Sequence, residues 1–112
     1  MTSETKQRLT NVLNACRSIE TFITGKDFAK FQSDDMLQSA VERKLEIIGE
    51  AFVKLEICDP ELSQKFPDLR KIVGLRNRII HGYDSVDDEI IWDIATNKVS
   101  ALRQQVESFG IK

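Results

Sequence analysis

Two side chains with complementary chemistry stand close together in the segment LRNRIIHGYD, residues 75–84. Arg76 precedes His81 by five positions, and His81 is the only histidine in the chain. Histidine exchanges a proton near neutral pH, and arginine offers a fixed charge with parallel donors that match phosphate oxygens. Such a pair could cleave RNA without a metal. The histidine would assist attack of a ribose 2′-hydroxyl on its own phosphate, and the arginine would stabilise the charge that builds on the phosphoryl oxygens.

The same spacing also allows a purely structural role. A histidine that ends a helix interacts favourably with the negative end of the helix dipole. Arg76 lies within an apolar helical pattern, so we expect it to be partly covered and to need an anion. That anion is either a phosphate or a carboxylate of the fold, such as Glu46 or Glu50.

Helix geometry places Arg76 and His81 on different faces. Five residues along an α-helix turn through about 500°, which leaves the two side chains about 140° apart. One helix presents both to a single ligand only if it distorts near Gly82 or if another chain completes the site. Because each chain has one histidine, a two-fold dimer would bring two histidines and two arginines to one cleft.

The charges near the motif form a local basic segment. Arg70, Lys71, Arg76 and Arg78 lie within nine residues that contain no acidic side chain. The whole chain has 112 residues and a net charge of −2, which excludes general coating of nucleic acid and leaves a local patch as the expected binding site. Within that patch Lys71 and Arg78 are candidate contacts for RNA phosphates.

The rest of the composition predicts a cytoplasmic protein without a cofactor. Cys16 and Cys58 lie far apart at apolar helical positions, which is typical of a reducing compartment. No apolar run is long enough to span a membrane. There is no clustered set of metal ligands and no glycine-rich phosphate loop, so we expect neither a metal nor a cofactor.

Apolar residues at three- and four-residue steps predict an all-α fold. The expected helices are one between Ser3 and Gly25, one from Ser33 or Asp34 to Asp59, a short one over 61–66, one from Pro67 to Gly82, and a long one over 86–109. We therefore predict an antiparallel four-helix bundle with an additional short helix, formed by a single domain over residues 1–112. The stretch 26–35 is expected to be a connector whose Phe28 and Phe31 tuck under the core.

The motif and two further blocks resemble a known family. Arg76-Asn77 followed by His81-Gly82-Tyr83, in GLRNRIIHGY, is similar to the motif of HEPN-domain proteins, specifically the HepT-like toxins encoded beside a minimal nucleotidyltransferase. The blocks AVERKLEIIGEA, residues 40–51, and VDDEIIWDI, residues 86–94, are also similar. The likeness covers about residues 4 to 109.

This resemblance implies a homodimer with both motifs in a shared cleft. It implies metal-independent endoribonuclease activity on tRNA or mRNA by a toxin of a type VII-like toxin–antitoxin pair, with Arg76 and His81 catalytic. The implied partner is a nucleotidyltransferase antitoxin that transfers adenylate from ATP to Tyr83. A different class of function is a non-catalytic helical adaptor that docks a nucleotidyltransferase or binds nucleotide.

Four residues outside the pair also have expected roles. Asn77 directly follows the catalytic arginine, and Glu50 could hold Arg76 in position. Arg43 and Glu50 lie seven residues apart on one helix face, and we expect them to form an ion pair inside the bundle. Trp92 is expected to be a core or interface residue rather than a platform for bases.

Overall fold

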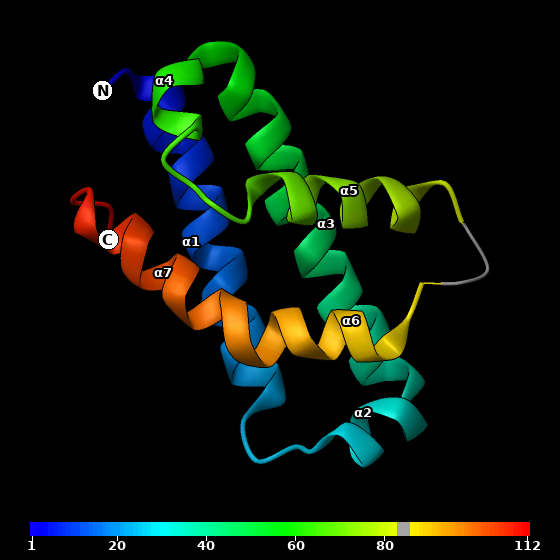
Figure 1. The fold of residues 1–112 in the computed structure, drawn as a ribbon. Coiled ribbons are helices and arrows are strands. Elements are labelled where there is room, and N and C mark those ends of the chain that lie inside the picture. The colour runs from blue at the N-terminus through cyan, green and yellow to red at the C-terminus, as the bar shows by residue number, and fades with distance from the viewer. Residues whose placement is uncertain (83–85) are drawn as a thin grey trace.

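The computed structural model describes residues 1–82 and 86–112, and every regular element in them is helical. The long helices are α1 (Ser3–Ile23), α3 (Asp35–Cys58) and α5 (Leu69–Ile80), and α6 (Asp88–Asp93) continues through the π-helical turn η1 (Ile94–Lys98) into α7 (Val99–Ser108). The short helices are α2 (Phe28–Ser33) and α4 (Pro60–Ser63). The predicted all-α bundle is confirmed (Figure 1).

Aspartate side chains begin four of these helices. The Asp34 carboxylate accepts a hydrogen bond from the Leu37 backbone N–H at 3.1 Å, as expected for an N-cap of α3. Asp59 caps α4 in the same way, with Pro60 in its first turn. Asp27 and Asp87 cap α2 and α6.

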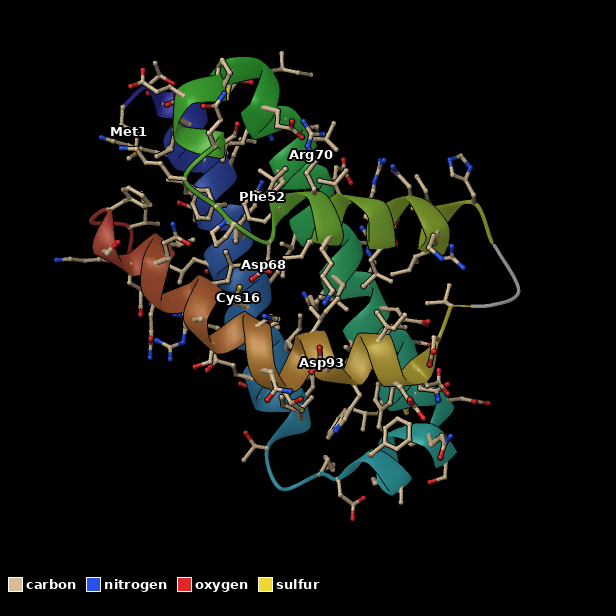
Figure 2. The ribbon with its side chains drawn as sticks, viewed as in Figure 1. Met1, Cys16, Phe52, Asp68, Arg70 and Asp93 are labelled. Atoms are coloured by element: carbon tan, nitrogen blue, oxygen red, sulfur yellow. The ribbon has the colours of Figure 1, made fainter. Side chains whose placement is uncertain are left out.

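The core forms where α1 packs against α3 on one side and α7 on the other. Its largest fully buried side chains include Phe31 and Phe52, and Phe52 stacks on Phe66 with ring centroids 5.2 Å apart. Figure 2 labels Phe52 in this interior and Arg70 at the surface. Within the described residues, no helix is long and apolar enough to cross a membrane.

The stretch expected to be only a connector contains a helix of its own. Phe31 of α2 is fully buried and stacks on Trp92 of α6, with ring centroids 5.1 Å apart. Phe28 is half-buried against the same core. The predicted burial of both phenylalanines is thus correct, and Trp92 has the expected packing role. The connector prediction was wrong because six residues are too short to show a helical period clearly.

The last long helix is interrupted by a π turn that the periodicity did not predict. The wider turn changes which carbonyls have a helical partner. The Thr96 hydroxyl donates a 2.7 Å hydrogen bond to the Trp92 carbonyl, and the Val99 N–H donates to the Ile94 carbonyl.

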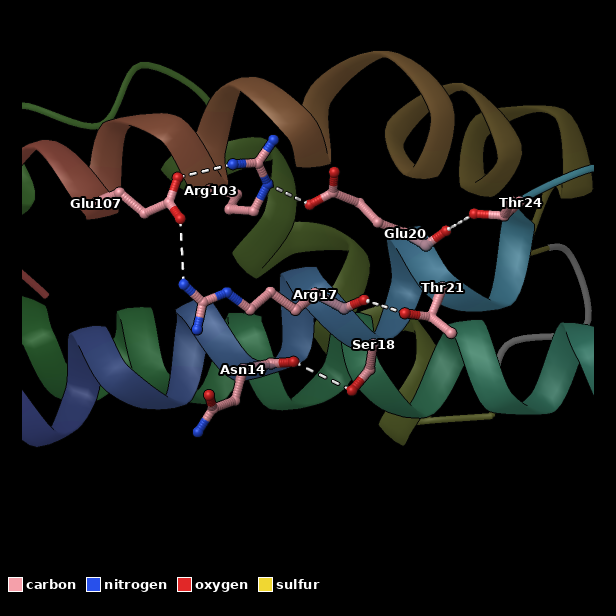
Figure 3. Close-up of polar contacts among 8 residues, drawn as sticks. All are labelled: Asn14, Arg17, Ser18, Glu20, Thr21, Thr24, Arg103 and Glu107. Carbon is pink, nitrogen blue, oxygen red and sulfur yellow. Dashed lines mark hydrogen bonds and ion pairs between the residues drawn. The ribbon is translucent and has the colours of Figure 1, made fainter. Parts of the chain in front are cut away.

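A surface network fastens α1 to α7. Arg103 donates from Nε to Glu20 at 2.6 Å and from Nη1 to Glu107 at 2.7 Å, and Arg17 contacts the second oxygen of Glu107 at 3.1 Å (Figure 3). Because Arg17 hydrogen-bonds to Glu107, the pKa of this carboxyl lies below its usual value.

Candidate active site

Helix α5 carries the arginine–histidine motif and packs mainly on α3. Leu69, Ile72 and Leu75 are its buried side chains. In Figure 1 the helix crosses α3, and its C-terminal end extends away from α1 and α7. This placement exposes much of the surface of α5 near the motif.

His81 lies at the exposed C-terminal end of α5. Its backbone is still helical, with φ −85° and ψ 0°, and its N–H donates to the Asn77 carbonyl at 3.1 Å. Gly82 follows with a φ of +64°, a conformation that glycine adopts without strain. Because α5 stays regular through His81, no distortion before Gly82 turns His81 toward Arg76.

Arg76 is half-buried between α5 and α3. Its Nε is buried and has no hydrogen-bond partner among the described residues, whereas Nη1 donates to the Asn77 side-chain oxygen at 2.9 Å. Asn77 therefore restrains one end of the guanidinium, and the structure brings these two expected site residues together.

Glycine at position 49 is what lets Arg76 lie so close to α3. A Cβ built on Gly49 would overlap Arg76 Cβ, would lie 2.8 Å from Arg76 Cγ and would lie 3.3 Å from the Ile72 carbonyl oxygen. Sequence reasoning did not identify Gly49. The signal was present, because it is the one glycine inside the long apolar pattern of α3.

Glu50 is not placed beside Arg76 by any described contact. Its carboxylate pairs with Lys54 at 3.3 Å, and Arg43 pairs with Glu46 at 3.3 Å. The expected Arg43–Glu50 ion pair is therefore wrong. Residues seven apart are separated by about 10 Å along a helix, whereas partners three or four apart lie next to each other.

Most other arginines in the described part of the chain have a carboxylate partner. Arg8, Arg17, Arg43, Arg70 and Arg103 each pair with a glutamate. Arg76 forms no such pair within residues 1–82 and 86–112, although it is half-buried. Neither Glu46 nor Glu50 supplies the carboxylate that a structural role would require.

A groove lies between α5 and α6, next to the motif. It encloses about 490 Å³ and is lined by Arg70, Lys71, Gly74, Leu75, Arg78, Asp87 and Ile90. The structure thus brings Lys71 and Arg78, the expected phosphate contacts, to one surface. His81, three residues after Arg78, is not among the residues that line the groove.

Tyr83, the expected acceptor of adenylate, lies outside the described residues. Among the residues that are described, no group of three or more histidine, cysteine, aspartate or glutamate side chains could hold a metal ion. His81 and Gly82, the two described residues that directly precede Tyr83, are both exposed.

The fold and the site together describe an all-α bundle that presents an arginine–histidine motif at an exposed helix end. Comparison with known sequences identifies the family to which this chain belongs. The family described as Ribonuclease HepT-like matches residues 12–109. The chain is 32% identical over 106 residues to a protein of Methanocaldococcus jannaschii, covering 93% of this chain and 94% of the relative. It is 34% identical over 99 residues to one of Caldanaerobacter subterraneus subsp. tengcongensis, covering 88% of each. Both relatives carry the name "Putative RNase".

A third relative bears the family name itself. The "Probable ribonuclease HepT" of Thermococcus cleftensis is 31% identical over 102 residues, covering 91% of this chain and 92% of the relative. No solved structure gives a significant match. The chain belongs to the HepT-like ribonuclease family.

Proposed function

We propose that this protein is an endoribonuclease in which Arg76 and His81 cleave RNA by attack of the ribose 2′-hydroxyl. The observation that carries the proposal is the half-buried Arg76, which has no carboxylate partner in the described residues. A covered guanidinium without a protein anion is suited to bind a phosphate. Membership of a ribonuclease family supports RNA, such as tRNA or mRNA, as the source of that phosphate.

In this reaction the 2′-oxygen attacks phosphorus, and the bond from phosphorus to the 5′-oxygen of the next nucleotide breaks. His81 accepts the proton of the 2′-hydroxyl, and a second acid gives a proton to the departing 5′-oxygen. The products are a 2′,3′-cyclic phosphate and a 5′-hydroxyl. Arg76 stabilises the phosphoryl oxygens as charge builds on them, and Lys71 and Arg78 hold the flanking phosphates along the groove. The mechanism uses no metal.

We further propose that the active site forms in a homodimer. Helix α5 is regular through His81, so Arg76 and His81 of one chain remain on different faces. A second copy related by a two-fold axis would place the partner subunit's His81 near Arg76, so that each site takes its arginine from one chain and its histidine from the other. Ile80, within the motif, and Ile90, on α6, are 41% and 47% exposed, which provides apolar surface for such a contact.

Mixing inactive variants tests the shared site. Arg76→Ala and His81→Ala homodimers should each be inactive, but unfolding and refolding them together should form heterodimers with one intact site. Random pairing predicts recovery of roughly a quarter of wild-type activity, because half of the dimers are mixed and each has one of two sites complete. If every chain holds its own complete site, the mixture stays inactive.

The cellular role that we propose is that of the toxin in a type VII-like toxin–antitoxin pair in the cytoplasm. The antitoxin would be a nucleotidyltransferase that transfers AMP from ATP to the Tyr83 phenol oxygen and releases pyrophosphate. The new phosphodiester, two residues from His81, would occupy the position of the RNA phosphate and repel the incoming backbone.

Intact mass measurement tests this regulation. The protein is incubated with ATP and the nucleotidyltransferase encoded beside it, and Tyr83→Phe serves as the control. One adenylate added to the wild type alone, together with loss of RNA cleavage, supports the proposal. Full inhibition of an unmodified protein would instead show that the partner acts by binding, and tight binding without any wild-type cleavage would favour the non-catalytic adaptor.

A further inference from the structure

We propose that Gly49 is a positioning residue that sets the direction in which Arg76 presents its guanidinium. This inference rests on the proposed function, because it assigns Gly49 a role in placing the phosphate-binding arginine. It concerns a residue on α3 that touches neither RNA nor His81. The effect of Gly49 would therefore pass entirely through the contact between α3 and α5.

The contact between α3 and α5 leaves no room for a side chain at position 49. Cβ and Cγ of Arg76 occupy the space that a side chain at position 49 would need, and the Ile72 carbonyl closes the space from the preceding turn of α5. Glycine inside a helix costs conformational entropy relative to alanine, so its presence in the middle of α3 needs a compensating gain. Here the gain is the approach of α5 to α3 at Arg76.

The approach also fixes which guanidinium atoms remain available. Arg76 Nε is buried without a partner, so it cannot donate to a phosphate in this arrangement. Nη1 is held by Asn77 at 2.9 Å. The phosphate must therefore contact the Nη atoms of the guanidinium. A side chain at position 49 that displaced Cβ and Cγ of Arg76 would also move these Nη atoms. Displacement of a catalytic group by about 1 Å is enough to cost roughly a hundred-fold in rate.

Hydrogen exchange at arginine Nε–H tests the placement without any assay of activity. In wild-type protein the Arg76 Nε–H should exchange slowly, because the atom is buried. Arg8 is a matched internal control, since its Nε is also buried without a partner but lies on α1. The signal of Arg76 is assigned by its loss in Arg76→Lys. Gly49→Ala should accelerate exchange at Arg76 and leave Arg8 unchanged.

RNA cleavage provides the functional readout. Gly49→Ala should lower the cleavage rate roughly a hundred-fold, without changing the shape of the pH–rate profile, because the substitution removes no titrating group. Val106→Ala, a core substitution in α7, controls for lost stability and should keep the wild-type rate below its melting temperature. In an Arg76→Lys background the alanine at position 49 should cost little further activity, because both changes act on one contact.

Each result bears on a separate claim. Fast exchange at Arg76 in the wild type, or slow exchange that Gly49→Ala does not alter, overturns the positioning role even if Gly49→Ala fails to cleave. Wild-type cleavage by a folded Gly49→Ala does the same while leaving the proposed function intact. If the wild type cleaves no RNA but Gly49→Ala specifically releases Arg76, the proposed function fails and the placement stands.

Discussion

Replacing the two helical glycines Gly49 and Gly74 by alanine should change the free energy of unfolding in opposite directions. Alanine is favoured over glycine in a helix interior by about 1 kcal/mol. At Gly74, in α5, nothing lies within 4 Å of the new Cβ. Gly74→Ala should therefore stabilise the chain by about 0.5–1 kcal/mol.

At Gly49 the same helix preference is opposed by a steric overlap. The new Cβ would overlap Arg76 Cβ and lie 2.8 Å from Cγ, and these atoms belong to the base of the side chain, which moves only if α5 moves. Overpacking of this kind costs about 1–3 kcal/mol. Since the severe overlap places the cost near the upper end, we expect a net destabilisation of about 1–2 kcal/mol after the helix gain is subtracted.

Thermal unfolding followed by circular dichroism measures both effects. For a domain of this size 1 kcal/mol shifts the melting temperature by about 4 °C, so the two variants should differ by roughly 6–12 °C. All samples need the same protomer concentration, because dimerisation makes the melting temperature concentration-dependent. A Gly49→Ala protein as stable as the wild type would refute the close approach of α5 to α3, and a destabilised Gly74→Ala would refute the open surface assigned to that position.

Three further predictions concern other parts of the fold. Asp34→Ala removes the N-cap of α3 and should lower the free energy of unfolding in urea by about 1 kcal/mol, whereas Asp34→Asn should retain most of it. The Arg17 hydrogen bond lowers the pKa of Glu107 below its ordinary 4.5, so this carboxylate stabilises the fold above pH 4.5, and the stabilisation is lost as the pH falls through the lowered pKa. The free energy of unfolding should therefore fall less steeply with acid in Glu107→Gln than in the wild type. An identical pH dependence in both proteins would contradict the network. Burial raises the pKa of Cys16 to about 12, so a thiol reagent at pH 8 should modify half-buried Cys58 first, and equal rates would contradict the packing of α1.

Periodicity and local capping signals were enough to predict most of the fold. The apolar pattern that ends at Asp59-Pro60 and begins at Asp34 corresponds to α3, because a long amphipathic helix with an aspartate at its start has few alternatives. The short helix α2 and the π turn over 94–98 were missed. Helix α2 has only six residues, and its Phe31 packs on Trp92, two residues before the π turn, in a tertiary contact that the apolar pattern does not show.

The residues of the candidate site could be proposed from the sequence, but the contacts that hold them in place could not. The types and spacing of Arg76, Asn77 and His81 identify the motif, and α5 stays helical through His81, as the argument from helix geometry requires. The partner of Glu50 was predicted incorrectly, because Lys54 is four residues from Glu50 along α3, whereas Arg43 is seven residues away and Arg76 lies on α5. Gly49 was overlooked because a contact between two helices depends on their register, which the sequence of one helix does not specify.

Cleavage of a defined RNA by purified protein in the presence of a chelator tests the central claim most directly. The wild type should produce 2′,3′-cyclic phosphate and 5′-hydroxyl ends, and His81→Ala and Arg76→Ala should each lower the rate by roughly two to four orders of magnitude while keeping the helical circular dichroism spectrum. Arg17→Ala, which removes an arginine from the α1–α7 network, should cleave at the wild-type rate. Wild-type cleavage by either motif variant, or complete dependence of the wild type on added magnesium, would contradict the assignment of Arg76 and His81 as a metal-independent catalytic pair.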